Sequence, residues 1–339
     1  MKKKATIRDI AAQSGFSTAT VSRYINNSSY VDPDTASKIE SVISLLDYKP
    51  NMVAQSLKTK KSRSILLIVP DVSNPFYSSM AKIVQGRAKK ENFNITLFNT
   101  NEEEIFELSE EIKAIRLAVQ MNACGIIMAS IDVKETVVEE LRKADIPTVV
   151  VNSYDACAYD SVHGKRNQST YLATKHLIDY GHKRIAYTGG SKKSVIGRSR
   201  QNGYLAAMKE ADFKIEENLI YETGFSVNSG YEAGRYFSSI TPLPTAICCA
   251  NDLVAMGVMA SLRDLNISIP EQISITGMDD IPFAVLCAPR LTTVTNDSQK
   301  FANAAIDMLF DRIQGEYQGV PREVEVDREL IVRESTRRI

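Results

Sequence analysis

Residues Thr6–Asn26, TIRDIAAQSGFSTATVSRYIN, decide how the chain begins to fold. Ile7, Ile10 and Ala11 are spaced three and four residues apart, so a helix places them on one face. The polar residues between them fall on the opposite face. This stretch therefore predicts a short amphipathic helix at the start of the chain.

A turn and a second helix follow directly. Gly15 suits a turn position with positive φ, and Ser17 is placed to cap the next helix with its hydroxyl. Val21 and Ile25, four residues apart, give that helix a buried face. Two short helices around a glycine turn are typical of a DNA-binding helix-turn-helix, although ordinary helix packing gives the same pattern.

A third helix is predicted after Asp32, which supplies a cap ahead of Pro33 at the first helical position. Its apolar stripe is formed by Ile39, Val42, Ile43 and Leu46. We therefore expect a three-helix head, residues 1–49, followed by a hinge helix and linker, residues 50–63. The hinge segment is too short to be a stable helix alone, so we expect it to fold on binding.

Charge is divided unevenly along the chain. Residues 1–63 hold eleven Lys/Arg and five Asp/Glu, a net +6; the whole chain has 41 of each sign, so the remainder carries −6. A basic head on an acidic body suggests that the head meets a polyanion such as a nucleic acid.

The length and composition are those of an ordinary globular protein. The chain has 339 residues, enough for two or three domains, and 44% of them are hydrophobic. No apolar run approaches the roughly 18 residues of a membrane span. The basic start, MKKKATIRDI, is not followed by the apolar segment of a signal peptide. We therefore expect a cytoplasmic protein.

From Ser64 onward, buried-type strands alternate with helices. Apolar strands such as SILLIVPD and TAICCA, separated by helical segments, predict α/β architecture with parallel sheets covered on both faces. Two successive sets of this alternation predict a bilobed body, residues 64–339. We place the N-lobe at about 64–161 and 293–322 and the C-lobe at about 162–290 and 323–339, with the tail crossing back between them.

No catalytic or metal-binding constellation is apparent. The five cysteines include no CxxC pair and are expected to be buried thiols, and the three histidines are too few and too widely spaced for a metal site. His182, which follows a predicted helix, is expected to be a surface residue or a helix cap. There is no GxSxG, HExxH or phosphate-binding glycine loop. We therefore expect neither an enzyme nor a bound metal or cofactor.

Taken together, TIRDIAAQSGFSTATVSRYIN, the DP–T helix start and YKPNMVAQSLKT resemble the DNA-binding head and hinge of the LacI family of bacterial transcription regulators. The resemblance runs without gaps from the first helix through the hinge and continues as scattered motifs in the body. It implies a periplasmic-binding-protein-like body that holds a small effector between its lobes. It also implies a homodimer that binds palindromic operator DNA as two half-sites.

The same resemblance assigns DNA-binding residues. Thr18, Ala19 and Arg23 are carried over as base-facing, and Arg23 is expected to bridge guanine O6 and N7. Leu57 in the hinge is expected either to wedge into the minor groove or to dock on the body as an ordinary linker leucine. Phosphate contacts are expected from Thr6, Thr20, Ser22 and Asn26. The remaining predicted DNA-binding residues are Ser17, Asn51, Ala54, Gln55 and Lys58.

Strand ends and family motifs together predict the effector site. Ligands in open α/β sheets sit at the carboxyl ends of strands. The motifs GRSRQNGY, TGFSVNSG, ANDLVAMG and GMDD resemble segments that supply an arginine, an aromatic ring and polar groups, a set that fits a sugar. The predicted residues are Asn74, Phe76, Asn152, Arg166, Arg200, Phe225, Asn251, Asp252 and Asp279. The alternative is structural, with Asp252 and Asp279 as helix caps and Phe225 in the core.

One departure from the family pattern bears on the charge of the effector. Lys165 and Arg166 stand where the family usually has an acidic or neutral residue. With Arg198 and Arg200 they are predicted to form a cluster that suits a carboxylate or phosphate, so a sugar acid or sugar phosphate becomes a candidate beside a neutral sugar. A solvated basic surface is the other interpretation.

The sequence thus predicts a transcription regulator, most simply a repressor of a carbohydrate or sugar-acid utilisation operon. Its operator affinity is expected to change when a metabolite binds between the lobes. The rival is a solute-binding protein of a transporter, which fits the body but neither the basic head nor the missing signal peptide. A fused enzyme is disfavoured because no catalytic set is visible.

Overall fold

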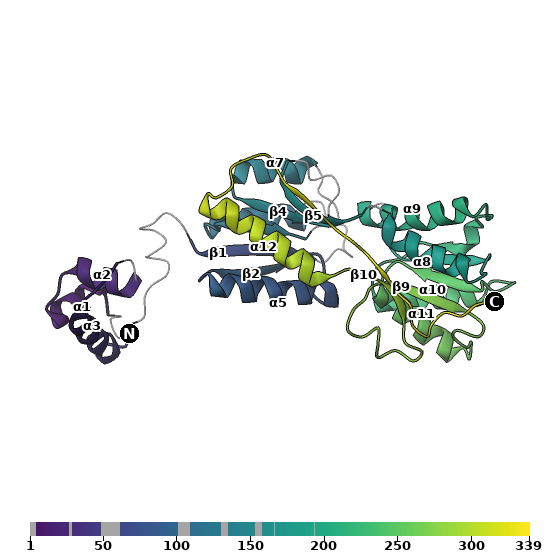
Figure 1. Cartoon of the computed structure of the whole chain (residues 1–339), viewed down its shortest axis with the longest axis horizontal. Coiled ribbons are helices and arrows are strands. Elements are labelled where there is room, and N and C mark those ends of the chain that lie inside the picture. Colours follow the sequence, from purple (N-terminus) through teal and green to yellow (C-terminus); the bar gives the residue numbers. More distant parts are fainter. Residues whose placement is uncertain are drawn as a thin grey trace. The chain divides into compact units, whose positions relative to one another are not determined.

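The computed structural model describes residues 5–26, 29–48, 62–100, 109–129, 135–152, 158–165, 167–192 and 194–339. The chain divides into two compact units, Met1–Ser62 and Arg63–Ile339. Figure 1 shows the helical head and the α/β body that these units form.

The head is a three-helix unit with a small apolar core. Its helices are α1 (Ile7–Ser14), α2 (Thr18–Asn26) and α3 (Pro33–Leu45). Ile10, Val21 and Ile39, one from each helix, are fully buried in a common cluster. The predicted helices and their apolar stripes are confirmed.

Local sequence sets the turn between α1 and α2. Thr6 caps α1 and exchanges hydrogen bonds with Asp9 in a capping box. Gly15 ends the helix at φ 77°, a left-handed conformation that costs other residues more than glycine. Ser17 then accepts a 3.1 Å hydrogen bond from the backbone N–H of Thr20, which opens α2.

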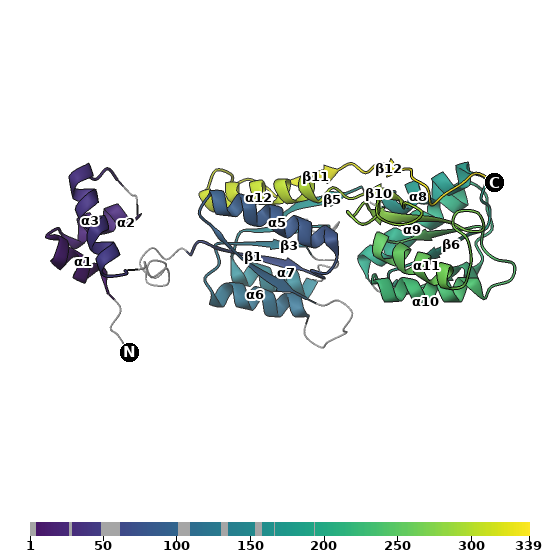
Figure 2. The same cartoon turned by 90° about the horizontal axis from the view of Figure 1, so that it is seen from below.

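The N-lobe of the body is built on a six-stranded parallel sheet. In spatial order its strands are β11 (Glu323–Val326), β5 (Asp160–Gly164), β4 (Thr148–Val151), β3 (Gly125–Met128), β1 (Ser64–Val69) and β2 (Asn94–Asn99). Leu66 and Leu67 point to opposite faces and both are fully buried, because helices cover both sides. Figure 2 shows one face covered by α5 (Pro75–Lys90) and α12 (Ser298–Gln314) and the other by α6 (Glu110–Gln120) and α7 (Glu135–Ala144).

The C-lobe repeats this plan. Its six strands lie in the order β12 (Leu330–Ile331), β10 (Thr292–Thr295), β9 (Ser274–Asp279), β8 (Ala246–Cys249), β6 (Ile185–Thr188) and β7 (Ile220–Tyr221). Only β12 pairs antiparallel to its neighbour among these described strands. The covering helices are α8 (Gln168–Asp179) and α9 (Val195–Glu210) on one face and α10 (Val227–Ser238) and α11 (Asp252–Asp264) on the other.

The chain passes between the lobes three times. The first crossing joins β5 to α8, the second joins β10 to α12 at residues 296–297, and the third joins β11 to β12 at residues 327–329. These points differ by a few residues from the approximate lobe boundaries expected from the sequence. The reason is pairing, since β10 pairs with β9 of the C-lobe and β11 pairs with β5 of the N-lobe.

The histidines and cysteines have structural surroundings. His182 is 1% exposed, with Nδ1 3.0 Å from the Thr245 hydroxyl and Nε2 3.1 Å from the Arg337 carbonyl oxygen. Its expected surface position is wrong, because segments far along the chain cover it. The thiols of Cys248 and Cys249 are buried as expected, those of Cys124 and Cys287 are half-buried, and Cys157 lies outside the described residues.

Two classes of feature are absent from the part of the chain that the structure describes. Its side chains form no group of His, Cys, Asp and Glu suited to a metal ion. Its helices include none that is long and apolar enough to cross a membrane.

Candidate functional site

Helix α2 presents a polar surface of small side chains and one arginine. Thr18, Ala19 and Arg23 are exposed, and Thr20 and Ser22 are half-buried. Ala19 and Arg23 are four residues apart and so share one face of the helix. A helix with one guanidinium and otherwise small residues on its outer face can lie in a major groove and reach a base edge.

Several other predicted DNA-binding residues have local partners. The Thr6 hydroxyl donates a 2.7 Å hydrogen bond to the Asp9 carboxylate, and the Ser17 and Thr20 hydroxyls lie 3.0 Å apart. Thr6 and Ser17 are nevertheless exposed. The side chain of Asn26 and the hinge residues lie outside the described residues, so their roles stay predictions: Asn51, Ala54, Gln55, Leu57 and Lys58.

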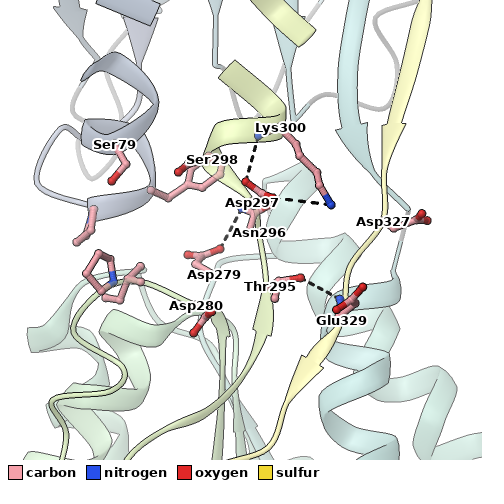
Figure 3. Close-up of a pocket in the computed structure, with 14 residues that line it drawn as sticks. Ser79, Asp279, Asp280, Thr295, Asn296, Asp297, Ser298, Lys300, Asp327 and Glu329 are labelled. Atoms are coloured by element: carbon pink, nitrogen blue, oxygen red, sulfur yellow. Dashed lines mark hydrogen bonds and ion pairs between the residues drawn. The ribbon is translucent and has the colours of Figure 1, made fainter. Parts of the chain in front are cut away.

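In the body, a cavity of about 300 Å³ lies between the two lobes, beside the second and third crossings (Figure 3). The N-lobe contributes Phe76 and Ser79 from α5 and Lys300 from α12. The C-lobe contributes Asp279 and Asp280 from the end of β9. A molecule in this cavity therefore contacts both lobes.

The charged residues that line this cavity are mainly acidic. The carboxylates belong to Asp279, Asp280, Asp297, Asp327 and Glu329. Among the described lining residues the one cation is Lys300, whose Nζ lies 3.8 Å from the carboxylate of Asp297. Part of this negative charge is compensated from outside the lining, because Arg333 lies 2.6 Å from the Asp280 carboxylate and Arg200 lies 3.8 Å from that of Asp279.

Asp279 is the centre of a polar network that spans the lobes. It is 6% exposed, accepts a 3.1 Å hydrogen bond from Asn296 Nδ2, and lies 3.8 Å from Arg200 Nη2. Burial raises the pKa of Asp279 above its ordinary value. Opposing this rise, in decreasing order, are the guanidinium of Arg200, the hydrogen bond from Asn296, the guanidinium of Arg328 and a hydrogen bond from Asn74.

Arg200 and Phe225 form a platform next to Asp279. The guanidinium carbon of Arg200 lies 5.1 Å from the ring centroid of Phe225, and Nη1 donates a 2.8 Å hydrogen bond to the Ala250 carbonyl. Asn251 donates a 2.9 Å hydrogen bond to the Phe225 carbonyl and also caps α11. These bonds hold an aromatic ring and a cation in fixed relation.

Asp252 has a structural role. Its fully buried carboxylate accepts hydrogen bonds from the Thr293 hydroxyl at 2.6 Å and from the Ile281 backbone N–H at 2.9 Å. Burial raises the pKa of Asp252 well above its ordinary value. The residue that caps α11 is the neighbouring Asn251, and Asp252 instead fastens the segment after β9 to β10.

The structure brings only part of the predicted effector set to the cavity. Phe76 and Asp279 line it. Asn74 and Arg200 interact with Asp279 directly. Phe225 contacts Arg200, and Asn251 contacts Phe225. Asn152 is buried at the end of β4 with φ 60°, its N–H bonded to the Val162 carbonyl, and Arg166 lies outside the described residues.

Sequence reasoning missed several residues that line the cavity. They include Asn296, Asp297, Lys300, Asp327 and Glu329, all on or beside the second and third crossings. The strand-end rule would have found Asn296 and Asp297 if LTTVTND had been treated as a strand of the C-lobe sheet. The sequence gives no comparable signal for Asp327 and Glu329 of the third crossing. Their position depends on the long-range pairing of β11 with β5 and of β12 with β10.

Two described members of the predicted cation cluster, Arg198 and Arg200, have different surroundings. Arg198 is exposed and its Nη1 donates a 3.0 Å hydrogen bond to the Lys192 carbonyl, whereas Arg200 faces Asp279. Residues two apart on a helix do not share a face. Lys165 is also exposed. Arg198 and Arg200 therefore face different surroundings, and Arg166 lies outside the described residues.

Comparison with known proteins gives matches over both units. A family model described as "Bacterial regulatory proteins, lacI family" matches residues 6–51, and a "Periplasmic binding protein-like domain" model matches residues 174–336. The HTH-type transcriptional regulator RegA of Clostridium saccharobutylicum is 32% identical, covering 98% of this chain and 99% of its own length. The HTH-type transcriptional repressor PurR of Vibrio vulnificus strain CMCP6 is 33% identical over 99% of each chain.

The fold has a matching solved structure as well. The structure of the Lac repressor dimer bound to operator and the anti-inducer ONPF superposes with a TM-score of 0.87 at 25% identity, covering 99% of this chain and 100% of that one. The similarity therefore extends over the head and the body.

Proposed function

The chain belongs to the LacI family of bacterial regulatory proteins, and from this premise we propose that it is a homodimeric repressor controlled by a small neutral metabolite. Its head and body make it a DNA-binding transcriptional regulator with an effector-binding domain. The relatives are regulators and not enzymes, and a solute-binding protein would have no head of this kind.

Helix α2 reads the operator in this proposal. Arg23 is exposed on the face that it shares with Ala19, so its fork is free to reach a guanine edge in the major groove. The small side chains of Thr18 and Ala19 allow the helix to lie close to the bases. The hinge residues predicted from the sequence would add minor-groove contacts next to each half-site.

The effector is a neutral molecule rich in hydroxyl or N–H donors. The observation that carries this proposal is the lining of the cavity, to which five carboxylates and the Phe76 ring contribute. Carboxylates accept hydrogen bonds from hydroxyl and N–H groups, while they repel the carboxylate or phosphate of an anionic effector. A neutral sugar and a purine base both meet this requirement, so a carbohydrate operon is one of two target classes.

The C-lobe carries a surface suited to self-association. After β9, Phe283 is 52% exposed, Val285 47% and Leu286 75%. Neighbouring exposed apolar side chains mark an interaction site, and a two-fold axis lets one such patch pair with its own copy. The Lac repressor solved with operator is a dimer, which supports the same assembly here.

Effector binding is coupled to DNA binding through the lobes. A molecule in the cavity touches Phe76 of the N-lobe and Asp279 of the C-lobe, so it favours one lobe angle over others. In a dimer that angle sets the separation of the two hinges. Such coupling is typically worth about 1–3 kcal/mol.

Two experiments test the proposal. Full-length protein is used to select bound sites from random duplex DNA at a stated salt concentration, and a palindrome is expected. Calorimetry then compares neutral probes (cellobiose, ribose, hypoxanthine) with anionic ones (gluconate, glucose 6-phosphate). No enriched sequence would refute the DNA-reading role, and tight binding restricted to the anionic probes would refute the neutral effector.

A further inference from the structure

The backbone turns sharply at the end of β9, where Asp279 and Asp280 both line the cavity (Figure 3). Asp279 has φ 111° and Asp280 has φ 48°, two successive positive values at residues other than glycine. Aspartate adopts a φ near 50° at turns, whereas a φ of 111° is rare for any residue with a side chain. Such a conformation costs free energy and persists only when the surrounding structure holds it. The turn therefore needs contacts that keep it in place.

Arg333, on the segment that follows β12, holds this turn through Asp280. Its Nη2 donates a 2.6 Å hydrogen bond to Asp280 Oδ1, and its Nη1 donates a 2.8 Å hydrogen bond to the Leu291 carbonyl. The side chains of Arg333 and Asp280 are 14% and 30% exposed, so water and salt screen this ion pair less than one at the open surface. A planar guanidinium that is bonded through two nitrogens has a fixed orientation, and it fixes the carboxylate that it binds.

Arg333 is itself anchored in the C-lobe. Its backbone N–H donates a 2.9 Å hydrogen bond to the Thr292 hydroxyl. Two residues further on, the fully buried hydroxyl of Ser335 accepts a 2.8 Å hydrogen bond from the Thr292 backbone N–H and donates one of 2.6 Å to the Ile275 carbonyl. The segment after β12 is thus tied to β9 and β10. Because Arg333 and the turn belong to the same lobe, their ion pair does not depend on the angle between the lobes.

The ion pair uses one carboxylate oxygen of Asp280, and within the described part of the chain the other, Oδ2, has no bonded partner. We propose that Arg333 is a positioning residue of the effector site. By binding Asp280 Oδ1 it holds the strained turn in place and leaves Oδ2 to accept a hydrogen bond from a hydroxyl or N–H group of the effector. This inference rests on the proposed function of the cavity, and Arg333 is not among the site residues predicted from the sequence.

The first test measures effector binding by calorimetry of the full-length protein at pH 7, with cellobiose, ribose and hypoxanthine as probes. For a probe that wild type binds, Arg333→Met should weaken binding about tenfold, because the turn loses a charge-assisted bond that holds it. Arg333→Lys should recover part of this loss, because it keeps the charge but not the two-nitrogen geometry. In an Asp280→Asn background, Arg333→Met should weaken binding little further, because the ion pair is already lost.

Arg290→Met is the matched control. Arg290 also belongs to the C-lobe and also pairs with the segment after β12, its Nε lying 3.8 Å from the Glu334 carboxylate. Its side chain is 63% exposed, and Glu334 does not line the cavity, so this variant should bind the probe as wild type does. Wild-type affinity in Arg333→Met would overturn the proposal, and so would an equal loss in Arg290→Met.

A second test needs no effector. The backbone N–H groups of Asp280 and Ile281 are hydrogen-bonded to the side chains of Thr293 and Asp252, so loosening of the turn exposes them to exchange with solvent. Hydrogen exchange followed by mass spectrometry compares residues 278–284 with strand β8. In Arg333→Met, exchange at 278–284 should be about tenfold faster, while exchange in β8 stays as in wild type.

A merely structural role for Arg333 would speed exchange in both segments, because the whole C-lobe would be less stable. Unchanged exchange at 278–284, or equal acceleration in β8, would therefore overturn the inference. Failure of all three probes to bind wild type would overturn the proposed effector site alone, because the exchange measurement decides independently whether Arg333 holds the turn.

Discussion

The Thr293 hydroxyl donates a 2.6 Å hydrogen bond to the carboxylate of Asp252, and both side chains are fully buried. The bond ties the first turn of α11 to β10, the strand that leads into the second crossing. The Asp252 carboxylate also accepts a hydrogen bond from the backbone N–H of Ile281, which lines the cavity. We therefore expect the hydrogen bond between Thr293 and Asp252 to stabilise the C-lobe and to help position Asp279.

Thr293→Val should lower the free energy of unfolding by about 1–3 kcal/mol, because it leaves a buried acceptor without its donor. Chemical denaturation of the full-length protein measures this change. Thr96→Val is the control, since Thr96 is only half-buried in β2 and its replacement should stay within about 0.5 kcal/mol. Equal losses in the two variants would contradict the importance of the Asp252 bond.

Arg23→Ala should weaken binding to the selected operator by about 1–3 kcal/mol and relax the preference for one base pair in each half-site. Fluorescence anisotropy on operators that vary at each position gives both quantities. Lys38→Ala removes an exposed cation from α3 and should weaken binding to all sequences slightly and evenly. If Arg23→Ala also weakened binding equally for all operator sequences, Arg23 would be assigned to a phosphate contact.

The body should lose stability in acid through His176. Burial lowers the pKa of His176 to about 4, and its Nε2 lies 3.0 Å from the Thr336 hydroxyl. The unfolded chain binds this proton at higher pH than the folded chain, so stability falls as pH drops from about 6.5 to about 4, by up to about 3 kcal/mol. His176→Gln should flatten the pH dependence of urea denaturation in this window, and parallel curves would disprove the assignment.

Leu286→Glu should dissociate the proposed dimer. A carboxylate in the exposed apolar segment after β9 would be buried without a partner in the proposed interface. Sedimentation velocity across a concentration series measures the change. Val320→Glu, at a 77% exposed site outside that segment, is the control and should leave the oligomeric state as in wild type.

The head and the architecture of the body follow from the sequence because their signals are local. Gly15, Ser17 and Asp32 determine turns and caps within a few residues of themselves. The apolar strands of the body also give a local signal. Strands that are buried on both faces need continuous apolar runs, and such runs predict parallel sheets. The helix positions and the two-lobe form both follow from such short-range information.

The finer structure of the cavity depends on contacts between distant segments and was not predictable in this way. From the sequence, Asp252 could be a helix cap. Its hydrogen-bond partner in the structure is Thr293 of β10, which is 41 residues further along the chain. The position of Arg328 could not be predicted from the sequence, because it depends on the pairing of β11 with β5, which brings Arg328 against Gly164. The acidic side chains of the cavity likewise come from separate segments, the second crossing, the third crossing and the end of β9, which only the folded chain brings together.

The three crossings also dictate an order of events during synthesis on the ribosome. Phe301 and Phe310 of α12 complete the apolar core on one face of the N-lobe sheet, yet they are translated after nearly the whole C-lobe. One apolar face of the N-lobe therefore stays uncovered until late in synthesis, whereas by then all the C-lobe strands except β12 have been made. Nascent chains of this protein should accordingly depend on chaperone binding at β1 and β3 until the last helix emerges.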